Sequence, residues 1–302
     1  MRINFFQNLT GHETIEDPQY VLQNVDIEVL TRAGEGIDFK PCVESGDGFM
    51  TQSPWVSLQN AKFKFSYMTG SANQAAMGEV LELTTHKLSQ INQNLSKLIP
   101  KDLFFDNDKE KSRLALKVKT MYFGDNDISE NNRDKLSLCY SDSQYLNSAI
   151  RTARLLAKGG SHVYFYEFSL DNNSSPINGS ARGDSMNLIF GTEETTSYND
   201  EQTNKNVMRE MMINIWISFI KYGNPSAENI TWKNLKYGDQ KSEEWLSIGS
   251  AVEMRKGLHV ERLKLWDDLY NSYYIERNKG LGHKPVGFLT IVSWSVLAFL
   301  KL

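Results

Sequence analysis

Residues 141–168, with the sequence SDSQYLNSAIRTARLLAKGGSHVYFYEF, decide the fold class because they join a helical pattern to a strand pattern. The apolar positions with a helical period are Leu146, Ile150, Ala153 and Leu156. Ser141 or Asp142 is expected to cap this helix, and the glycine pair that begins at Gly159 is expected to end it. Residues 161–168 then bring the aromatic and β-branched side chains that strands favour. A helix that leads directly into a strand predicts an α/β protein.

Three further segments extend this alternation along the chain. Lys62–Met68 alternates with the period of two that is typical of a strand. One helical face is formed by Leu81, Leu88, Ile91, Leu95 and Leu98, and a second is formed by Met208, Met212, Ile215 and Phe219. The first helix should stop before Pro100, which cannot continue a helix. The apolar residues of the second spread beyond one stripe, so we expect that helix to be buried on most sides.

The charge balance excludes one class of partner. The 302 residues include 33 Lys and Arg and 37 Asp and Glu, which give a formal net charge of -4. A chain without a basic face cannot neutralise a phosphate backbone, so we expect no nucleic-acid partner. An apolar content of 40% and a charged content of 23% are typical of a folded globular protein and not of a disordered chain.

The residues that usually hold metals and cofactors do not form a known pattern. Cys42 and Cys139 are too few for a disulfide framework or a thiolate-rich metal site, and they either pair or lie buried as small hydrophobes. The five histidines contain no pair at i, i+4, which excludes a zinc site of the H-E-x-x-H kind. No Walker lysine loop and no G-x-G-x-x-G after a strand occur. We therefore expect neither a metal nor a cofactor.

Six N-x-[ST] sequons are candidate glycosylation sites, and they matter only in a protein that enters the secretory pathway. They lie at Asn8, Asn94, Asn172, Asn173, Asn178 and Asn229. The first residues contain no sustained apolar run, so we expect no signal peptide in the chain as given. Either the protein is cytosolic or its N-terminus lies upstream of Met1. An extracellular or membrane-anchored location would require a signal peptide upstream.

The two ends of the chain differ in composition, and we divide it into an α/β domain (1–277), a polar linker (278–285) and an apolar tail (286–302). Residues 286–300 carry no charge, and as a helix they would span about 22 Å against a hydrocarbon core of about 30 Å. A membrane anchor, a lipid-anchor signal and a buried terminal helix are the alternatives. We favour a membrane-related tail because a charged, glycine-rich segment precedes it.

A series of short motifs occurs in a fixed order between these ends. They are FKPCVE at 39–44, GSANQAA at 70–76, IPKD at 99–102, YFGD at 122–125, SD at 141–142, VYFY at 163–166, GSARGD at 179–184, WISFIKYGNP at 216–225, WLSI at 245–248 and LWD at 265–267. In content and order they resemble the C-terminal part of the type-B carboxylesterase and cholinesterase family over about residues 18–274. The resemblance implies that residues 1–277 are a partial α/β-hydrolase domain with a mixed, mostly parallel sheet flanked by helices. It also implies that the serine elbow, the oxyanion-hole glycines and the first strands lie upstream.

The family hydrolyses esters with a serine, an acid and a histidine in that chain order. By resemblance the acid ends a G-x-x-x-x-E-G stretch, and Ala75 occupies that position here. The histidine belongs to a G-x-x-H-G-D pattern, in which this chain has Arg182, a side chain that stays protonated and cannot act as a general base. Glu79 is displaced by about 5 Å, one helical turn, and does not replace the missing acid. We expect this chain to be catalytically inactive.

Three interpretations of function follow from the resemblance. The first is a diverged carboxylesterase-like protein without activity, whose partner is a small-molecule ester or none. The alternative is a non-catalytic, cholinesterase-like adhesion or binding protein at the cell surface, comparable to neuroligins and neurotactin, with a protein partner. The third is an active ester hydrolase, against which Ala75 and Arg182 both argue. Membrane association through residues 286–302 is compatible with each of them.

Overall fold

The computed structural model describes residues 8–9, 11, 17–35, 43–44, 48–60, 62, 64–171, 175–191, 200–226 and 230–274. These residues form two units, one that ends at Ser53 and one that begins at Pro54. The first unit contains two short helices, α2 (Pro18–Asn24) and α3 (Ile27–Ala33). Each begins at an aspartate, Asp17 or Asp26, whose carboxylate accepts a backbone N–H of the first turn. Local capping therefore defines both helices.

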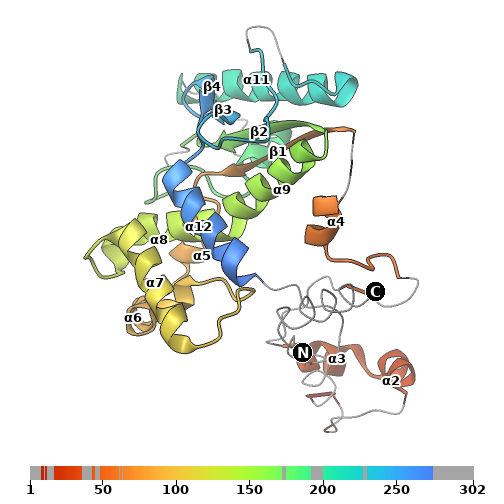
Figure 1. Ribbon diagram of the computed structural model, residues 1–302, viewed down its shortest axis with the longest axis vertical. Coiled ribbons are helices and arrows are strands. Elements are labelled where there is room, and N and C mark those ends of the chain that lie inside the picture. The colour runs from red at the N-terminus through yellow and green to blue at the C-terminus, as the bar shows by residue number, and fades with distance from the viewer. Residues whose placement is uncertain are drawn as a thin grey trace, which may run out of the picture. The chain divides into compact units, whose positions relative to one another are not determined.

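The second unit is built around a sheet whose described strands have the order β1-β2-β3-β4 (Figure 1). The strands are β1 (Ser66–Ala72), β2 (His162–Phe168), β3 (Glu244–Ile248) and β4 (Val252–Lys256). β1, β2 and β3 run parallel, and β4 returns antiparallel to β3. β1 and β2 pair over their whole length, from Ser66 opposite His162 to Ala72 opposite Phe168. This mixed, mostly parallel sheet confirms the predicted α/β class.

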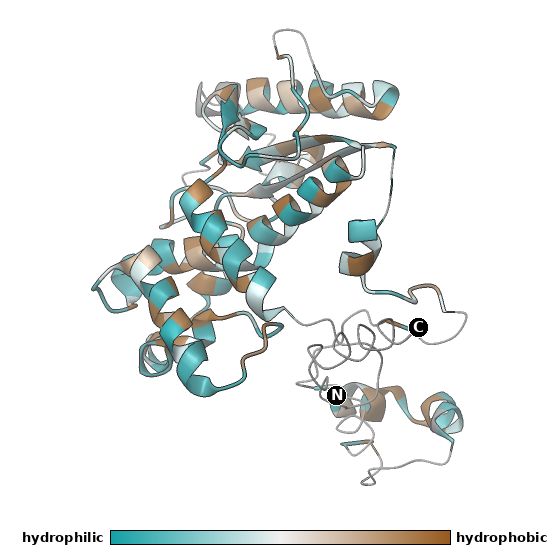
Figure 2. Cartoon of the chain, in the orientation of Figure 1, coloured by the Kyte–Doolittle hydropathy of each residue, from teal (hydrophilic) through white to brown (hydrophobic). Residues whose placement is uncertain are grey.

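Helices cover both faces of the sheet (Figure 1). On one face, α9 (Asn147–Lys158) packs Ile150, Ala153 and Leu156 against Val163 and Phe165 of β2. On the other face, α10 (Asp184–Phe190) and α11 (Asp200–Tyr222) contribute to a cluster that contains Leu188, Met208, Met212, Ile215, Tyr164, Phe168 and Ile248. Figure 2 shows that α9 and α11 carry both apolar and polar residues. The apolar positions that the sequence predicted on these helices form much of the two clusters.

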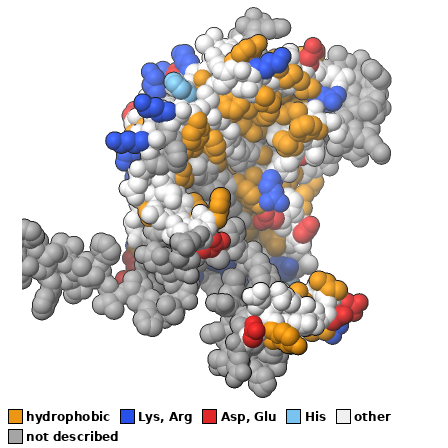
Figure 3. Space-filling view, turned by 90° about the vertical axis from the view of Figure 1, so that its right-hand side faces the viewer, with side chains coloured by type: hydrophobic (Ala, Val, Ile, Leu, Met, Phe, Trp, Pro, Cys, Tyr) orange, Lys and Arg blue, Asp and Glu red, His pale blue; other side chains and the backbone are white. Residues whose placement is uncertain are grey.

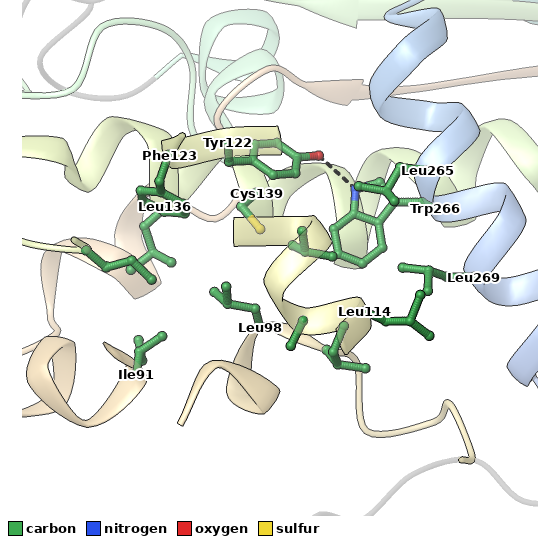
Figure 4. Close-up of a cluster of buried hydrophobic side chains, with 14 of the residues drawn as sticks. Ile91, Leu98, Leu114, Tyr122, Phe123, Leu136, Cys139, Leu265, Trp266 and Leu269 are labelled. Atoms are coloured by element: carbon green, nitrogen blue, oxygen red, sulfur yellow. Dashed lines mark hydrogen bonds between the residues drawn. The ribbon is translucent and has the colours of Figure 1, made fainter. Parts of the chain in front are cut away.

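A third hydrophobic cluster lies among helices away from the sheet (Figure 4). The remaining helical elements of this unit are α4 (Pro54–Asn60), α5 (Met77–Leu81), α6 (Thr85–Gln93), η1 (Leu95–Leu98), α7 (Asp108–Phe123), η2 (Glu130–Asn132), α8 (Arg133–Tyr140), η3 (Ser141–Leu146) and α12 (Val260–Tyr273). Trp266 of α12 is fully buried in this cluster, and its indole N–H donates to the Tyr122 hydroxyl of α7 at 2.8 Å. The cluster thus joins α12 to helices that lie far away in the sequence.

Two predicted elements have different boundaries in the structure. The strand predicted over Lys62–Met68 begins only at Ser66 and runs on to Ala72, because its partner strand begins at His162. The long helix predicted to stop before Pro100 does stop there, but it is divided into α5, α6 and η1. Thr84 caps α6 by accepting from the Lys87 N–H, and Asn94 accepts from the Ser96 N–H. These local hydrogen bonds compete with a continuous helix.

The predicted N-cap at Ser141 or Asp142 is wrong. α8 continues through the π-helical turn η3 into α9, so both residues lie inside a helical segment and both are buried. The Ser141 hydroxyl donates to the Ser137 carbonyl at 2.6 Å and accepts from the Ala76 N–H at 3.0 Å. Tertiary partners therefore use the side chains that the local pattern assigned to capping. The helix ends at Gly159 as predicted.

The predicted burial of α11 on most sides is also wrong. Val207, Ile217 and Ile220 are 57%, 43% and 77% exposed. Among the side chains of α11 that the structure describes, from residue 205 on, the buried ones are Met208, Met212 and Ile215, which pack in the sheet cluster. Met186 and Phe190 of α10 are likewise exposed. Figure 3 shows hydrophobic side chains gathered on the face of the molecule that it presents.

Several predictions concern residues at the ends of the chain or the cysteines. Cys139 is a free, fully buried thiol, and Cys42 lies outside the described residues. The linker at 278–285 and the tail at 286–302 also lie outside them, so both remain predictions. Within the described ranges, no helix is both long and apolar enough to cross a membrane.

Gly70 of β1 allows the close approach of Tyr166 on β2. A Cβ at Gly70 would lie 2.3 Å from the Tyr166 main-chain oxygen and 2.5 Å from its Cγ. We predict that Gly70→Ala lowers the free energy of unfolding by about 1–3 kcal/mol, because the strand pair must shift to admit the methyl group. Urea denaturation measures this loss. Gly78→Ala, at a helical position with open space around it, is the matched control and should gain up to about 1 kcal/mol. Equal losses in the two variants would contradict the steric explanation.

Candidate functional site

A pocket with a volume of about 220 Å³ lies at the C-terminal ends of β1 and β2. Most of its lining consists of small residues, and its larger side chains are Tyr145, Tyr166 and Arg182. Both sequence-predicted positions, Ala75 and Arg182, line it. No aspartate, glutamate or histidine is among the residues that line it. The pocket therefore offers a guanidinium, phenols and small side chains.

Hydrogen bonds between two loops bring Ala75 and Arg182 together. The turn after β1 and the loop before α10 are joined at Ser180, whose N–H donates to the Asn73 side-chain oxygen at 2.9 Å. The Gln74 N–H donates to the Ser180 carbonyl at 3.0 Å, and the Arg182 N–H donates to the Ala75 carbonyl at 3.4 Å. The two positions that the resemblance assigns to the acid and the histidine are thus neighbours in this fold.

Gly179 makes the close approach of these loops possible. Its φ is +120°, and an added Cβ would lie 2.8 Å from both the Oδ1 and the Nδ2 of Asn73. Glycine is the residue that adopts such a backbone conformation readily and leaves room for Asn73. The loop geometry at the pocket therefore depends on this glycine and on the hydrogen bonds of main-chain groups.

Tyr145 connects Glu79 with Arg182. Its hydroxyl donates to the Glu79 carboxylate and accepts from Arg182 Nη1 at 3.4 Å. The Arg182 guanidinium also lies 5.6 Å from the centre of the Tyr145 ring, within the range of a cation–π contact. Burial and the neighbouring Glu79 raise the pKa of Tyr145, an effect that Arg182 opposes. Tyr145 is therefore a neutral phenol at neutral pH, and Glu79, which is exposed on α5, is not among the lining residues.

Arg182 carries a positive charge without a carboxylate partner among the described residues. The nearest acidic residue in sequence, Asp184, accepts instead from the Ala181 N–H at 2.8 Å. Arg182 itself is exposed, and its guanidinium contacts the hydroxyl and the ring of Tyr145. An unpaired guanidinium at the rim of a pocket is suited to bind an anion.

Sequence reasoning missed an acid–imidazole pair elsewhere in this unit. His259 Nε2 lies 2.6 Å from Glu167 Oε2, and the Glu167 side chain is buried. His259 has a left-handed backbone with φ of 37° directly before α12. Neither residue lines the pocket. The signal in the sequence was a lone glutamate within the aromatic strand 162–168, but its partner lies 92 residues away.

A buried network also supports the helices around the site. Asp142 accepts from the Tyr122 hydroxyl at 2.6 Å and from Arg262 Nε at 2.7 Å. Burial raises the pKa of Asp142, and Arg262 opposes this shift. Burial and the nearby Asp142 raise the pKa of Tyr122, so that Tyr122 remains a hydrogen-bond donor. These residues do not line the pocket, and we assign them a structural role.

The predicted glycosylation candidates are only partly described. Asn8, Asn94 and Asn178 are exposed, whereas Asn172, Asn173 and Asn229 lie outside the described residues. The Asn8 side chain donates to the Ala33 carbonyl, and the Asn94 side chain caps η1. Glycosylation remains a prediction for all six. Among the described residues, no group of three or more His, Cys, Asp or Glu side chains is placed to hold a metal ion.

Comparison with known proteins identifies relatives over much of the chain. The profile of the carboxylesterase family matches residues 13–266. Esterase FE4 of Myzus persicae is 31% identical over 150 residues, which cover 46% of this chain and 26% of that protein. Neuroligin-2 of Homo sapiens is 22% identical over 261 residues, which cover 77% of this chain and 31% of that protein. The chain thus spans less than a third of the length of these two curated relatives.

The fold is similar to that of a solved esterase. The crystal structure of juvenile hormone esterase from Manduca sexta matches with a TM-score of 0.68 and 19% identity, over 88% of this chain and 55% of that one. This likeness confirms the expected α/β-hydrolase fold. Since the family profile also covers most of the sequence, from residue 13 to residue 266, the chain belongs to the carboxylesterase family.

Proposed function

We propose that this chain is a carboxylesterase-family protein that does not hydrolyse esters. The observation that carries the proposal is that Ala75 and Arg182 lie side by side at the pocket, where the Arg182 N–H donates to the Ala75 carbonyl at 3.4 Å. If these are the acid and histidine positions of the family, a methyl group and a guanidinium have replaced the two groups. A methyl group accepts no hydrogen bond from an imidazole, and a guanidinium does not take a proton from a serine.

Two neighbouring groups do not restore the missing pair. Glu79 accepts from the Tyr145 hydroxyl and is exposed on α5, so its carboxylate already has a partner. His259 and Glu167 form a close acid–imidazole pair, but neither lines the pocket. A general base must lie within hydrogen-bond reach of the group that it deprotonates. We therefore infer that the His259–Glu167 pair anchors the start of α12 to β2.

A rate measurement tests the absence of hydrolysis. We predict that the purified chain cleaves 4-nitrophenyl acetate and 4-nitrophenyl butyrate no faster than the same protein after heat denaturation. Removal of triad members from a serine hydrolase lowers kcat by about 10⁴–10⁶, which leaves only weak residual catalysis. The His259→Gln variant serves as a control, because it would lose any turnover that depends on the His259–Glu167 pair. Saturable turnover that a serine-directed phosphonate abolishes would overturn the proposal.

A second candidate function is binding at the cell surface without catalysis. Its support is the match to neuroligin-2, which covers 77% of this chain, against 46% for the match to esterase FE4. The exposed sequons Asn8, Asn94 and Asn178 are compatible with passage through the secretory pathway. Surface labelling of cells that express the natural gene, before and after removal of N-linked glycans, discriminates this candidate from an intracellular protein.

A further inference from the structure

We propose that the pocket beside Arg182 binds a small monocarboxylate with a short apolar or aromatic tail. The proposal rests on the proposed function, because it assigns a new use to the pocket of a chain that does not hydrolyse esters. The residues that carry it are Arg182 for the carboxylate, Tyr145 for the position of Arg182, and Gly70, Ala75 and Tyr166 for the tail. We refer to this site as the Arg182 pocket.

The charge of Arg182 is available to a ligand. Among the described residues it forms no ion pair, and its hydrogen bond to the Tyr145 hydroxyl, at 3.4 Å, uses one of five N–H donors. The planar guanidinium matches the two oxygens of a carboxylate, which accept two parallel hydrogen bonds. No carboxylate among the lining residues competes for it. An anion is therefore the ligand class that this group selects.

Tyr145 fixes the position of the guanidinium. Because the Tyr145 proton is donated to Glu79, the phenol oxygen presents lone pairs to Arg182. The raised pKa of Tyr145 keeps the phenol neutral at neutral pH, so this hydrogen-bond direction is maintained. The ring face adds a cation–π contact with the guanidinium, whose centre is 5.6 Å from the ring centre. Tyr145 is thus a positioning residue, and Arg182 is the residue that contacts the ligand.

The remaining lining selects a small, largely apolar tail. The volume of about 220 Å³ is below the range of about 300–1,000 Å³ that is usual for drug-sized ligands. Gly70 and Ala75 provide little side-chain bulk, and the ring of Tyr166 provides a surface against which an acyl chain or a flat ring can pack. Butyrate and benzoate fit this description. Their amides have the same shape but lack the negative charge.

Calorimetric titration of the full chain with butyrate and benzoate tests the proposal. We expect saturable binding of both carboxylates, and at least about tenfold weaker binding of butyramide and benzamide, since a charge-assisted hydrogen bond is lost. Arg182→Gln should weaken carboxylate binding about tenfold or more, and Arg182→Lys should recover only part of it because lysine lacks the planar fork. Tyr145→Phe should weaken binding by a smaller factor, since it removes the hydrogen bond to Arg182 but keeps the ring.

The matched control is Arg255→Gln on β4, an exposed arginine that pairs with Glu253 away from the pocket. This variant should bind both carboxylates as the native chain does, and circular dichroism should show that all the variants are folded. Binding that is unchanged in Arg182→Gln, or equal binding of the amides, would overturn the proposal. A chain that neither binds carboxylates nor cleaves nitrophenyl esters would overturn this site alone. Phosphonate-sensitive ester turnover would instead overturn the proposed function.

Discussion

Replacement of Arg154 by methionine should lower the free energy of unfolding by about 3–5 kcal/mol, the usual effect of removing one partner from a buried ion cluster. Arg154 lies on α9 and is 8% exposed. Its Nε and Nη2 donate to Glu243, each at 2.8 Å, and its Nη1 donates to Asp267 at 2.8 Å. Glu243 directly precedes β3, and Asp267 belongs to α12. Without the guanidinium, Glu243 would lose its ion-pair partner, and Asp267 would keep, among the described residues, only Arg151 Nε at 3.9 Å and the Gln240 side-chain amide at 3.0 Å.

An exposed ion pair of the same residue types provides the control for Arg154→Met. Arg255 Nη2 lies 2.5 Å from Glu253 Oε1 on β4, and the two side chains are 53% and 52% exposed. Arg255→Met should change the free energy of unfolding by less than about 1 kcal/mol, because solvent screens such pairs. Urea denaturation followed by circular dichroism measures both variants. A loss in Arg154→Met no larger than in Arg255→Met would show that the cluster does not stabilise the fold.

The loss of unfolding free energy in Arg154→Met should be smaller at low pH than at neutral pH, because the variant raises the pKa of Glu243. Burial raises the pKa of Glu243, and Arg154 lowers it, so the variant should have a still higher pKa at Glu243. Above about pH 4.3, the ordinary value for glutamate, the folded variant then keeps a proton that the unfolded chain has lost. Stability contributed by that proton is present at low pH and is lost as the pH rises through the raised pKa. The deficit of the variant should therefore be smaller at about pH 4.5 than at about pH 7.

Local sequence patterns predicted the elements whose limits are set by local chemistry. The strand at 161–168, the end of a helix at Gly159 and the stop before Pro100 all follow from residue type and agree with the structure. The start of β1 could not be predicted from residue type, since it depends on where its partner strand β2 begins. Ser141 belongs to a residue type that often caps helices. Its actual partners, the Ala76 N–H and the Ser137 carbonyl, are determined by tertiary packing. Periodicity contains no information about such partners.

The same limit applies to the candidate site. The order of the motifs predicted the family and singled out Ala75 and Arg182, but only the structure shows that the two lie side by side. The link from Glu79 through Tyr145 to Arg182 joins residues that are 66 and 37 positions apart. The pair of His259 with Glu167 spans 92 positions. Side-chain networks of this kind require the fold before they can be recognised.

The loops at the pocket are held by groups that do not belong to the proposed triad positions. Ser180 donates its N–H to Asn73 and accepts from the Gln74 N–H, and Gly179 supplies the backbone conformation that these bonds need. The contact between Ala75 and Arg182 uses only main-chain atoms. Changes of side chain at these two positions therefore leave the hydrogen bonds between the loops in place. The loop geometry at the pocket therefore does not depend on which side chains occupy positions 75 and 182.

The helical cluster should be the other part of the chain that is most sensitive to mutation, and Trp266 is the largest of its fully buried side chains (Figure 4). Trp266→Ala should lower the free energy of unfolding by about 3–5 kcal/mol, through lost burial and the cavity that remains. The indole is fully buried and donates to Tyr122 at 2.8 Å, and Tyr122 in turn donates to Asp142 at 2.6 Å. Its loss would leave the Tyr122 oxygen without that donor as well as an unfilled space.

A second variant at Trp266 separates packing from hydrogen bonding, and a variant outside the cluster serves as the control. Trp266→Phe keeps most of the aromatic ring volume but removes the indole N–H. It should therefore lower the free energy of unfolding by less than Trp266→Ala does, by about 1–2 kcal/mol. Phe190→Ala removes an aromatic side chain that is 73% exposed, and it should stay within about 0.5 kcal/mol of the native chain. Far-UV circular dichroism during urea denaturation reports all three without relying on tryptophan fluorescence. If Trp266→Ala and Phe190→Ala had similar effects, burial in this cluster would not account for the stability of the fold.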